Sequence, residues 1–230
     1  MHDWMKRHLA FLEENGEWFA RVFATYPDQM QCGRGCALCC HGLFDISFAD
    51  AFLLAEGYGR LPSAQREQAA ARAQVTQNLI EHEVPGLDPP FLLHGLPHSV
   101  LDRIVESARS PRCPLLGSHD ECLVYECRPL ACRLEGAPMV DSRDGPFGDW
   151  CELNFKQGLP SGSLDILTRD YYAIQAAEDI SNEVMSDLLL GKRLSEVTVF
   201  IPSVVTEYRS FWHSLVSAVS RDCQNKHRSD

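Results

Sequence analysis

The amino-acid sequence predicts a mainly α protein, a compact helical domain that carries its cysteines on loops and contains at most a small β-hairpin. Four long segments repeat their apolar residues at helical spacing. At 230 residues the chain is ample for a hydrophobic core and short enough for one domain. We therefore expect a single domain over residues 1–230, with a cysteine-rich core at about 30–151 and a helical C-terminal part at about 163–223.

The first two helices are predicted on either side of the first cysteines. Residues 4–23 set large apolar side chains among charges at helical spacing, which is typical of an amphipathic helix, and Pro27 follows its end. A second helix is expected to begin with Ser47 as its N-cap and to stop at Gly57 and Gly59.

Two further helices are predicted before the second group of cysteines. One is expected over residues 63–83, which are rich in Ala, Gln and Arg, and a short one over 98–109. Gly, Pro and Asp then recur through residues 133–163. Little regular structure is expected there beyond a β-hairpin near 138–148.

The C-terminal third is predicted to be helical again. Its apolar residues favour one long helix over 164–190, closed by Gly191, and another amphipathic helix over 203–219. Between them, residues 197–201 have the composition of a short strand that ends before Pro202.

The composition argues against several classes of protein. With 21 Lys and Arg against 32 Asp and Glu, the formal net charge is −11 and the pI is about 5.2, a balance that opposes binding to nucleic acid or to an anionic membrane surface. No apolar run reaches the roughly 18 residues of a membrane-spanning helix, and the N-terminus lacks the apolar stretch of a signal peptide. We expect a soluble, cytoplasmic protein that binds neither nucleic acid nor a membrane.

The ten cysteines need a role other than structural disulfides, because such bonds do not persist in a reducing compartment. Eight of them form two groups, a clustering for which core packing gives no reason. The first group is Cys32, Cys36, Cys39 and Cys40, and the second is Cys113, Cys122, Cys127 and Cys132. Cys151 and Cys223 stand apart.

The first group can converge on one site. If a helical turn begins at Cys36, then Cys36, Cys39 and Cys40 share one face, because residues three and four apart are neighbours on a helix. Two glycines keep the preceding loop pliable, so that Cys32 can fold back onto the same site. Thiolates are soft ligands that select zinc or an iron–sulfur cluster over calcium or magnesium.

The second group has arginines beside its cysteines. Arg128 and Arg133 can hydrogen-bond a thiolate sulfur or offset the charge of a four-thiolate site, and we therefore predict both as cofactor-binding residues. An ordinary salt bridge to one of the many Asp and Glu residues is an equally good interpretation of either arginine.

Both groups together resemble a known family. The motifs that carry the resemblance are Cys32-x3-Cys36-x2-Cys39-Cys40, Cys113-Pro-Leu-Leu, Cys122-Leu-Val-Tyr-Glu and Arg128-Pro-Leu-x-Cys132-Arg133. They look like those of the YkgJ-type cysteine-cluster proteins, which are described as zinc- or iron-chelating and are often called iron–sulfur oxidoreductases. The resemblance covers roughly residues 30–151, and the joint occurrence of both motifs is more specific than either alone.

The resemblance implies a set of eight metal ligands. They are Cys32, Cys36, Cys39, Cys40, Cys113, Cys122, Cys132 and Cys151. Cys127 falls where the family motif has no cysteine, and Cys223 lies in the final predicted helix, so we expect both to be bystanders.

The number and kind of metal centres stay open at this point. One four-ligand centre uses half of the eight cysteines and two centres use all of them. Adjacent Cys39 and Cys40 diverge by about 100° in a helix, so they can serve different centres. Zinc sites usually show two pairs of closely spaced cysteines, whereas only the first group has such a pair, so we expect an iron–sulfur cluster, a 4Fe-4S cluster, ahead of zinc.

The function also stays open. The site can belong to a redox or modification enzyme, such as an iron–sulfur oxidoreductase, or it can be a closed structural centre in a protein that binds a protein partner. Flagellin lysine methylases resemble the same family, so a methylase that uses S-adenosylmethionine on a protein substrate is a further alternative. The Cys32-x3-Cys36-x2-Cys39 spacing matches a radical S-adenosylmethionine motif, but the alternating strands and helices of those enzymes are not predicted.

No catalytic residue is predicted. The motifs of serine hydrolases, nucleotide-binding proteins and zinc proteases are absent from the sequence. His41 follows Cys40 directly and can ligate a metal, although a lone histidine beside a motif is more often an outer or surface group.

Overall fold

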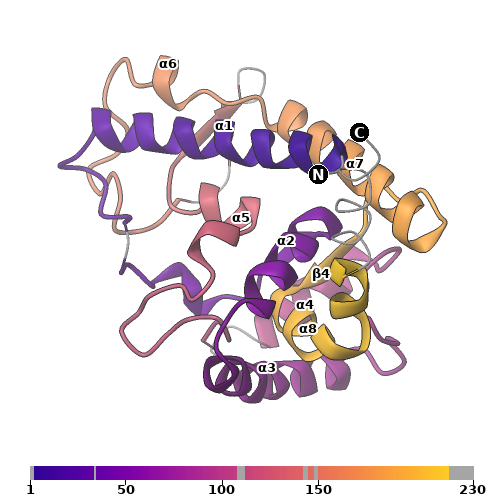
Figure 1. Cartoon of the computed structure of the whole chain (residues 1–230). Helices are drawn as coiled ribbons and strands as arrows, with labels where there is room; N and C mark the ends of the chain where they lie inside the picture. Colours follow the sequence, from indigo (N-terminus) through magenta and orange to yellow (C-terminus); the bar gives the residue numbers. More distant parts are fainter. Residues whose placement is uncertain (1–2, 34, 108–111, 142–144, 148–149, 218–230) are drawn as a thin grey trace, which may run out of the picture.

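The computed structural model of the chain describes residues 3–33, 35–107, 112–141, 145–147 and 150–217. Within these residues it confirms the mainly α prediction, because helices make up most of the structure and each strand is only three residues long. Figure 1 shows two long helices along one side of the molecule, a third along the opposite side, and the shorter helices and strands between them. None of the described helices is long and apolar enough to cross a membrane.

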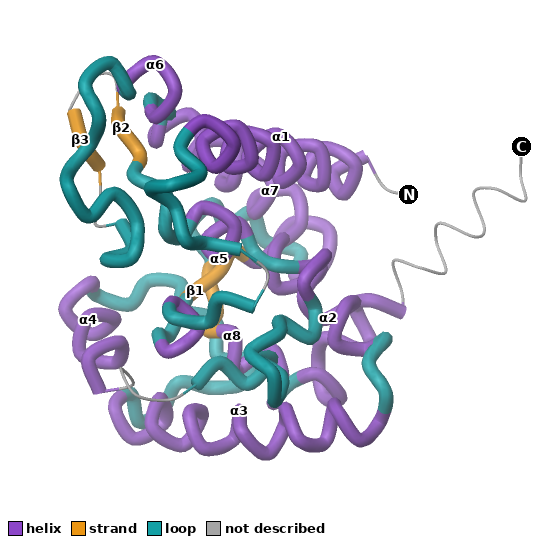
Figure 2. Tube along the Cα trace, turned by 90° about the vertical axis from the view of Figure 1, so that its left-hand side faces the viewer, coloured by secondary structure: helices purple, strands orange, loops and turns teal. Residues whose placement is uncertain are grey.

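Helices α1 (Asp3–Thr25) and α7 (Tyr171–Leu190) form the first side and pack against each other (Figures 1 and 2). The amphipathic helix predicted here is confirmed, and Trp4, Leu12 and Val22 of its apolar stripe are buried, whereas Leu9 and Phe23 are exposed. Trp4 at its start packs edge-on against Phe52 of the next helix, with 5.4 Å between the ring centroids.

Helix α2 (Phe48–Gly59) lies at the centre of the core, and almost all of its side chains are buried. As predicted, Ser47 caps it, because the serine hydroxyl oxygen accepts a hydrogen bond from the backbone N–H of Asp50 (3.2 Å). A helix that is buried all round cannot be amphipathic, which explains why its sequence is apolar on every face.

The prediction that Gly57 and Gly59 stop this helix is wrong. Both glycines lie within its last turn, and the chain leaves the helix at Arg60. Only glycine fits at these two positions, because other segments of the chain approach closely. A Cβ at Gly57 would lie 2.8 Å from the Cβ of Cys127, and a Cβ at Gly59 would collide with the Tyr208 hydroxyl. Both glycines therefore serve packing and do not end the helix.

Helix α3 (Ser63–Glu83) confirms the predicted helix at both ends and forms the opposite side of the molecule. It packs against α8 (Ile201–Thr206) and α4 (His98–Ser107). The last two residues predicted for α4 lie outside the described residues. A second, smaller apolar cluster lies between these elements, formed by Leu43, Ile80, Leu93, Ile104 and Phe200.

The strands form two separate antiparallel pairs. Strands β2 (Met139–Asp141) and β3 (Gly145–Phe147) make the predicted hairpin, whose turn at 142–144 lies outside the described residues. The predicted strand before Pro202 is confirmed as β4 (Thr198–Phe200), and it pairs with β1 (Asp45–Ser47) directly before α2. This second pair joins the first cysteine group to the C-terminal part of the chain.

The prediction of one continuous helix over residues 164–190 is wrong. Helix α6 (Leu164–Leu167) ends early, and the N–H of Arg169 then donates to the carbonyl of Val140 in the hairpin (2.8 Å). Asp170 begins α7 as its N-cap, because its carboxylate accepts from the N–H three residues later (3.2 Å). Hydrogen bonds to the hairpin and to this cap replace one turn of helix.

The ends of the last helices are partly as predicted. Gly191 closes α7 in the left-handed conformation, with φ of +66°. The helix predicted over 203–219 begins two residues early as α8 and is followed by a π-helical turn, η3 (Tyr208–Trp212). The Glu207 carbonyl accepts from two successive N–H groups in this turn. The last predicted residues, 218 and 219, lie outside the described residues.

Candidate metal centre

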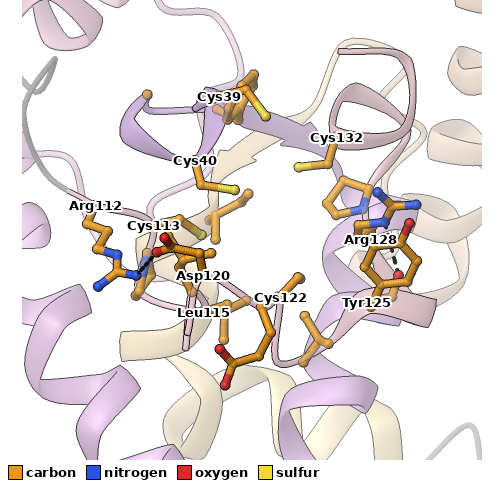
Figure 3. A pocket seen from close by; sticks show the side chains of 18 of the residues that line it. Cys39, Cys40, Arg112, Cys113, Leu115, Asp120, Cys122, Tyr125, Arg128 and Cys132 are labelled. Atoms are coloured by element: carbon orange, nitrogen blue, oxygen red, sulfur yellow. Dashed lines mark hydrogen bonds and ion pairs between the residues drawn. The ribbon is translucent and has the colours of Figure 1, made fainter. Parts of the chain in front are cut away.

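Cysteines from both sequence groups line one cavity of about 150 Å³ (Figure 3). They are Cys36, Cys39, Cys40, Cys113, Cys122 and Cys132. Most of the remaining wall is apolar and includes Leu54, Leu115 and Ile201. The cavity therefore combines soft sulfur donors with a mostly apolar wall, which also carries the charged side chains of Arg112, Asp120, Glu121 and Arg128.

Cys39 and Cys40 reach the cavity from a short 3-10 turn, η1 (Cys39–His41). The expectation that a helical turn begins at Cys36 is wrong, because Cys36 precedes the turn in irregular backbone. The three cysteines therefore do not share a helical face. Figure 3 shows the thiols of Cys39 and Cys40 directed into the cavity. His41 is exposed and does not line it.

The second group is joined to the first through the backbone. The N–H of Cys113 donates to the carbonyl of Cys40 at 2.7 Å. Helix α3 holds the loop that follows, because Arg72 donates to the carbonyl of Pro114 at 2.8 Å. A β-bridge then folds the chain back at Cys122. These contacts bring two distant stretches of sequence to one wall of the cavity.

Cys132 enters from the opposite wall on a short helix, α5 (Leu130–Leu134). The first N–H of this helix, that of Leu130, donates to one carboxylate oxygen of Asp50 at 2.7 Å. The other oxygen accepts from His8 Nε2 at 2.9 Å, since a carboxylate has no proton to donate. His8 is 0% and Asp50 is 1% exposed, so the pair fixes α5 to α1 and α2 within the core.

The environment of the cavity favours protonated thiols. Burial raises the pKa of Cys113 to about 11 and raises the pKa of Cys132 well above its ordinary value. The pKa of Cys39 is raised first by its hydrogen bond with Cys40 and then by burial. Metal binding at this site must therefore displace protons.

The two predicted cofactor-binding arginines hold the backbone beside the cavity. Arg128 lies over the ring of Tyr125 at 3.7 Å from its centroid and lines the cavity. Burial raises the pKa of Cys122, and the charge of Arg128 opposes that rise. Arg133 donates to the carbonyls of Arg128 (2.9 Å) and Glu126 (2.8 Å). A direct role of either arginine in binding a cofactor stays a prediction.

Two predicted ligands, Cys32 and Cys151, do not line the cavity. They meet at Gly136, where a Cβ would lie 2.5 Å from the Cys32 sulfur and 3.5 Å from the Cys151 Cβ. Asn154 donates to the Cys32 sulfur at 3.0 Å. The eight predicted ligands are therefore distributed over two neighbouring places.

Cys127 lies at the end of a 3-10 turn, η2 (Tyr125–Cys127), and faces Gly57 of α2. It does not line the cavity, and burial raises its pKa. Its role as a bystander stays a prediction, as does that of Cys223, which lies outside the described residues.

Comparison with known proteins places these cysteines in a family. The family model CxxCxxCC, described as a "putative zinc- or iron-chelating domain", matches residues 31–152. The chain belongs to the CxxCxxCC family. The match confirms the resemblance inferred from the sequence motifs and supports metal binding by the cysteines. No curated protein and no solved structure matches the chain.

The residues of this CxxCxxCC protein fit a soft metal in donor chemistry, because thiols from both groups meet in one cavity. In the part of the chain that the structure describes, no three His, Cys, Asp or Glu side chains are arranged to hold a metal ion. Zinc with bonds of about 2.3 Å to four sulfurs needs those sulfurs about 3.8 Å apart, so the loops must close to bind a single ion. The sulfur ligands of a polynuclear cluster lie farther apart than those of a single zinc ion, so binding a cluster requires a smaller movement of the loops.

Sequence reasoning missed the residues of the CxxCxxCC protein that hold its cysteines in place. Asp50, Asn154 and Gly136 are outside the cysteine motifs, and each acts on a residue distant in sequence. The only signal for Asp50 is its place in the first turn of a predicted helix, where it reads as an ordinary acidic residue. Nothing in the local sequence marks Asn154 or Gly136.

Proposed function

We propose that the protein binds a 4Fe-4S cluster in the cavity through the thiolates of Cys113, Cys122 and Cys132 and that of one first-group cysteine, Cys39 or Cys40. One observation carries the proposal: cysteines from both motif groups line a single cavity of about 150 Å³ whose remaining wall is mostly apolar. Such a space is about five times the volume of a water molecule in the liquid, which suits a polyatomic cluster better than a single ion. Zinc in the same cavity is the alternative within this proposal.

The bound cluster would supply one-electron redox chemistry, and an oxidoreductase is the class of enzyme that we propose on this basis. The chain's own residues would tune that chemistry. Arg128 places a positive charge on the cavity wall, opposing the negative charge of four thiolates. Apolar side chains limit the access of water, and the Asp50 contact holds the helix that bears Cys132. Wall polarity and nearby charge are the terms by which proteins set the potential of a cluster.

The proposed place of action is the cytoplasm, and the proposed partner is another protein that exchanges electrons or serves as substrate. A net charge of −11 favours a partner whose surface is positive over nucleic acid or an anionic membrane.

A second candidate function is a closed structural centre. Cys113, Cys122 and Cys132 pack against the main hydrophobic core, so a metal bound there would join the loops to the core and stabilise the fold. A structural centre would be redox-inert, whereas the proposed cluster would accept an electron reversibly.

The test is anaerobic purification of the full chain, followed by analysis of iron, acid-labile sulfide and zinc and by a redox titration. The proposal predicts brown protein that contains iron and sulfide in equal amounts, absorbs at about 400 nm and bleaches reversibly on reduction. Colourless protein with stoichiometric zinc would replace the iron assignment and support the structural function. Freshly prepared, reduced protein without any metal would refute both.

A further inference from the structure

A second cavity, of about 610 Å³, lies where the end of α2, the first turns of α3 and the end of α8 meet. The charged side chains on its wall are Arg66, Glu67 and Arg209, and the side chain of His213 also lines it. Positive charge therefore predominates on this wall, although the chain as a whole has a net charge of −11. None of the described residues that line this cavity also lines the cysteine cavity.

The two arginines of this cavity have N–H donors that no other group uses. One guanidinium nitrogen of Arg66 donates to the carbonyl of Gly59 at 2.9 Å, which fixes the side chain at the end of α2. In the part of the chain that the structure describes, neither Arg66 nor Arg209 forms an ion pair. Glu67 is exposed, so solvent screens its charge. A guanidinium has five donors in a planar fork that matches the oxygens of a phosphate or carboxylate.

Two tyrosines provide the aromatic part of the wall. Tyr58 is 4% exposed, and its hydroxyl donates to the carbonyl of Arg66 at 2.9 Å. The ring of Tyr208 packs edge-on against the ring of Tyr58, with 4.9 Å between the ring centroids. Burial raises the pKa of Tyr58, and the charges of Arg66 and Arg209 oppose that rise, so both guanidinium groups act on one hydroxyl. The wall thus combines aromatic surface with two cations.

The π-helical turn η3 brings His213 to the same wall. The N–H of His213 donates to the carbonyl of Tyr208, five residues earlier. Residues five apart point about 140° apart on an α-helix, whereas after this turn the two rings meet, with 5.6 Å between their centroids. Single π turns are rare and are frequently found at functional sites. An imidazole carries at least one N–H in either protonation state, so His213 adds a hydrogen-bond donor near the arginines.

We propose that this cavity binds a small phosphate monoester, with Arg66 and Arg209 on the phosphate oxygens and the organic part of the ligand against the ring of Tyr208. Two guanidinium groups match the charge of a phosphate monoester, which is close to −2 at pH 7, better than the single charge of a carboxylate. A cavity of about 610 Å³ exceeds the needs of a phosphate ion and is within the range of about 300–1,000 Å³ that small-molecule sites occupy. The inference does not depend on the proposed function, because no cysteine is among the described residues of this wall.

The test is isothermal titration calorimetry of the full chain in phosphate-free buffer, with phenyl phosphate, inorganic phosphate and phenol as probes. We expect phenyl phosphate to bind more tightly than inorganic phosphate, because its ring gains contact with Tyr208, and we expect no binding of phenol. Arg66→Gln and Arg209→Gln should each weaken the binding of phenyl phosphate by about 10–100-fold, because each removes a charged hydrogen bond to the phosphate. His213→Ala should weaken it by about 2–10-fold. Arg21→Gln is the matched control, since it removes the same charge from the exposed face of α1 and should leave the affinity unchanged.

Circular dichroism checks the folding of each variant, and Arg209→Gln is the decisive one because Arg209 is exposed. Absence of phenyl phosphate and inorganic phosphate binding at millimolar concentrations would overturn the site. So would unchanged affinity in both the Arg66 and the Arg209 variant, or an equal loss in Arg21→Gln, which would mean that the anion responds only to net charge. Phenol that binds as tightly as phenyl phosphate would overturn the anionic class of ligand. Metal content is measured in the same preparations, and metal-free protein that still binds phenyl phosphate would refute the proposed function alone.

Discussion

Replacing Asp50 should show that the placement of Cys132 depends on a residue outside the cysteine motifs. The Asp50 carboxylate accepts from His8 Nε2 and from the first N–H of α5, and both contacts are buried. Asp50→Ala removes both acceptors and leaves two buried donors without a partner. Asp50→Asn keeps one acceptor oxygen and presents an NH₂ group to one of the two donors.

The expected magnitude follows from these two contacts. A hydrogen bond to a charged group contributes about 1.5–3 kcal/mol, so Asp50→Ala should lower the free energy of unfolding by about 3–6 kcal/mol and Asp50→Asn by about half of that. A protein of this kind is stable by only about 5–15 kcal/mol, so the alanine variant should be close to unfolding. Ser47→Ala is the matched control, because it removes the cap of the same helix without touching α5 and should cost about 1 kcal/mol.

The assay is denaturant unfolding of the reduced, metal-free chain, together with thiol labelling read by mass spectrometry. Loosening of α5 should speed the labelling of Cys132 in the Asp50 variants far more than the labelling of Cys127, which is outside that helix. A loss below about 1 kcal/mol in Asp50→Ala, or equal labelling of Cys132 in the Asp50 and Ser47 variants, would refute the reasoning.

Three further predictions follow from the site and its surroundings. Cys132→Ser should empty the cavity of metal, whereas Cys127→Ser should leave the metal content unchanged; the reverse result would mean that the ligand set is wrongly assigned. Gly57→Ala should destabilise the fold by about 1–3 kcal/mol in denaturant unfolding, because its Cβ would lie 2.8 Å from that of Cys127, and Cys127→Gly should restore part of the loss; no restoration would contradict the contact. Burial raises the pKa of Glu178 from 4.5 to about 8, so the folded chain favours the protonated carboxylic acid. Ionisation of Glu178 therefore does not lower the free energy of unfolding below about pH 4.5, and it lowers that free energy most above pH 8. Glu178→Gln should therefore raise the melting temperature at pH 9 by a few degrees and leave it unchanged at pH 4.5, and equal effects at both values would exclude this cause.

The sequence predicted those parts of the fold whose signals are local. Helix α3 has a continuous run of helix-forming residues, and both its ends were predicted. The break before α7 was missed, because it depends on a hydrogen bond from Arg169 to Val140 in a hairpin 29 positions earlier. Strand β1 is three residues long, too short for alternation to be recognised, and it exists because β4 pairs with it.

In the candidate site too, sequence predicted the features that depend on local residues and missed those that depend on distant contacts. Residue type and spacing predicted metal binding by the cysteines, because thiolate chemistry is a property of the residue and the two groups can be seen in the sequence itself. The family match supports that prediction. Which cysteines meet was not predictable, because a backbone hydrogen bond from Cys113 to Cys40 brings the groups together. The neutral, buried amide of Asn154 has the appearance of any loop asparagine until its partners are known.

The pairing of β1 with β4 also bears on when the protein can acquire its metal. The ribosome makes Asp45–Ser47 long before Thr198–Phe200, and α2, which follows β1, is buried partly by α7 and α8 from the end of the chain. At about 5–20 residues per second, several seconds separate synthesis of the last cysteine in the ligand set from synthesis of the strand that completes this core. During this interval the thiols of the nascent chain are not yet enclosed by the folded core, so they are accessible to oxidants and to metal ions. Metal binding in the completed cavity should therefore follow release from the ribosome, and oxidation of these thiols before that point would prevent it.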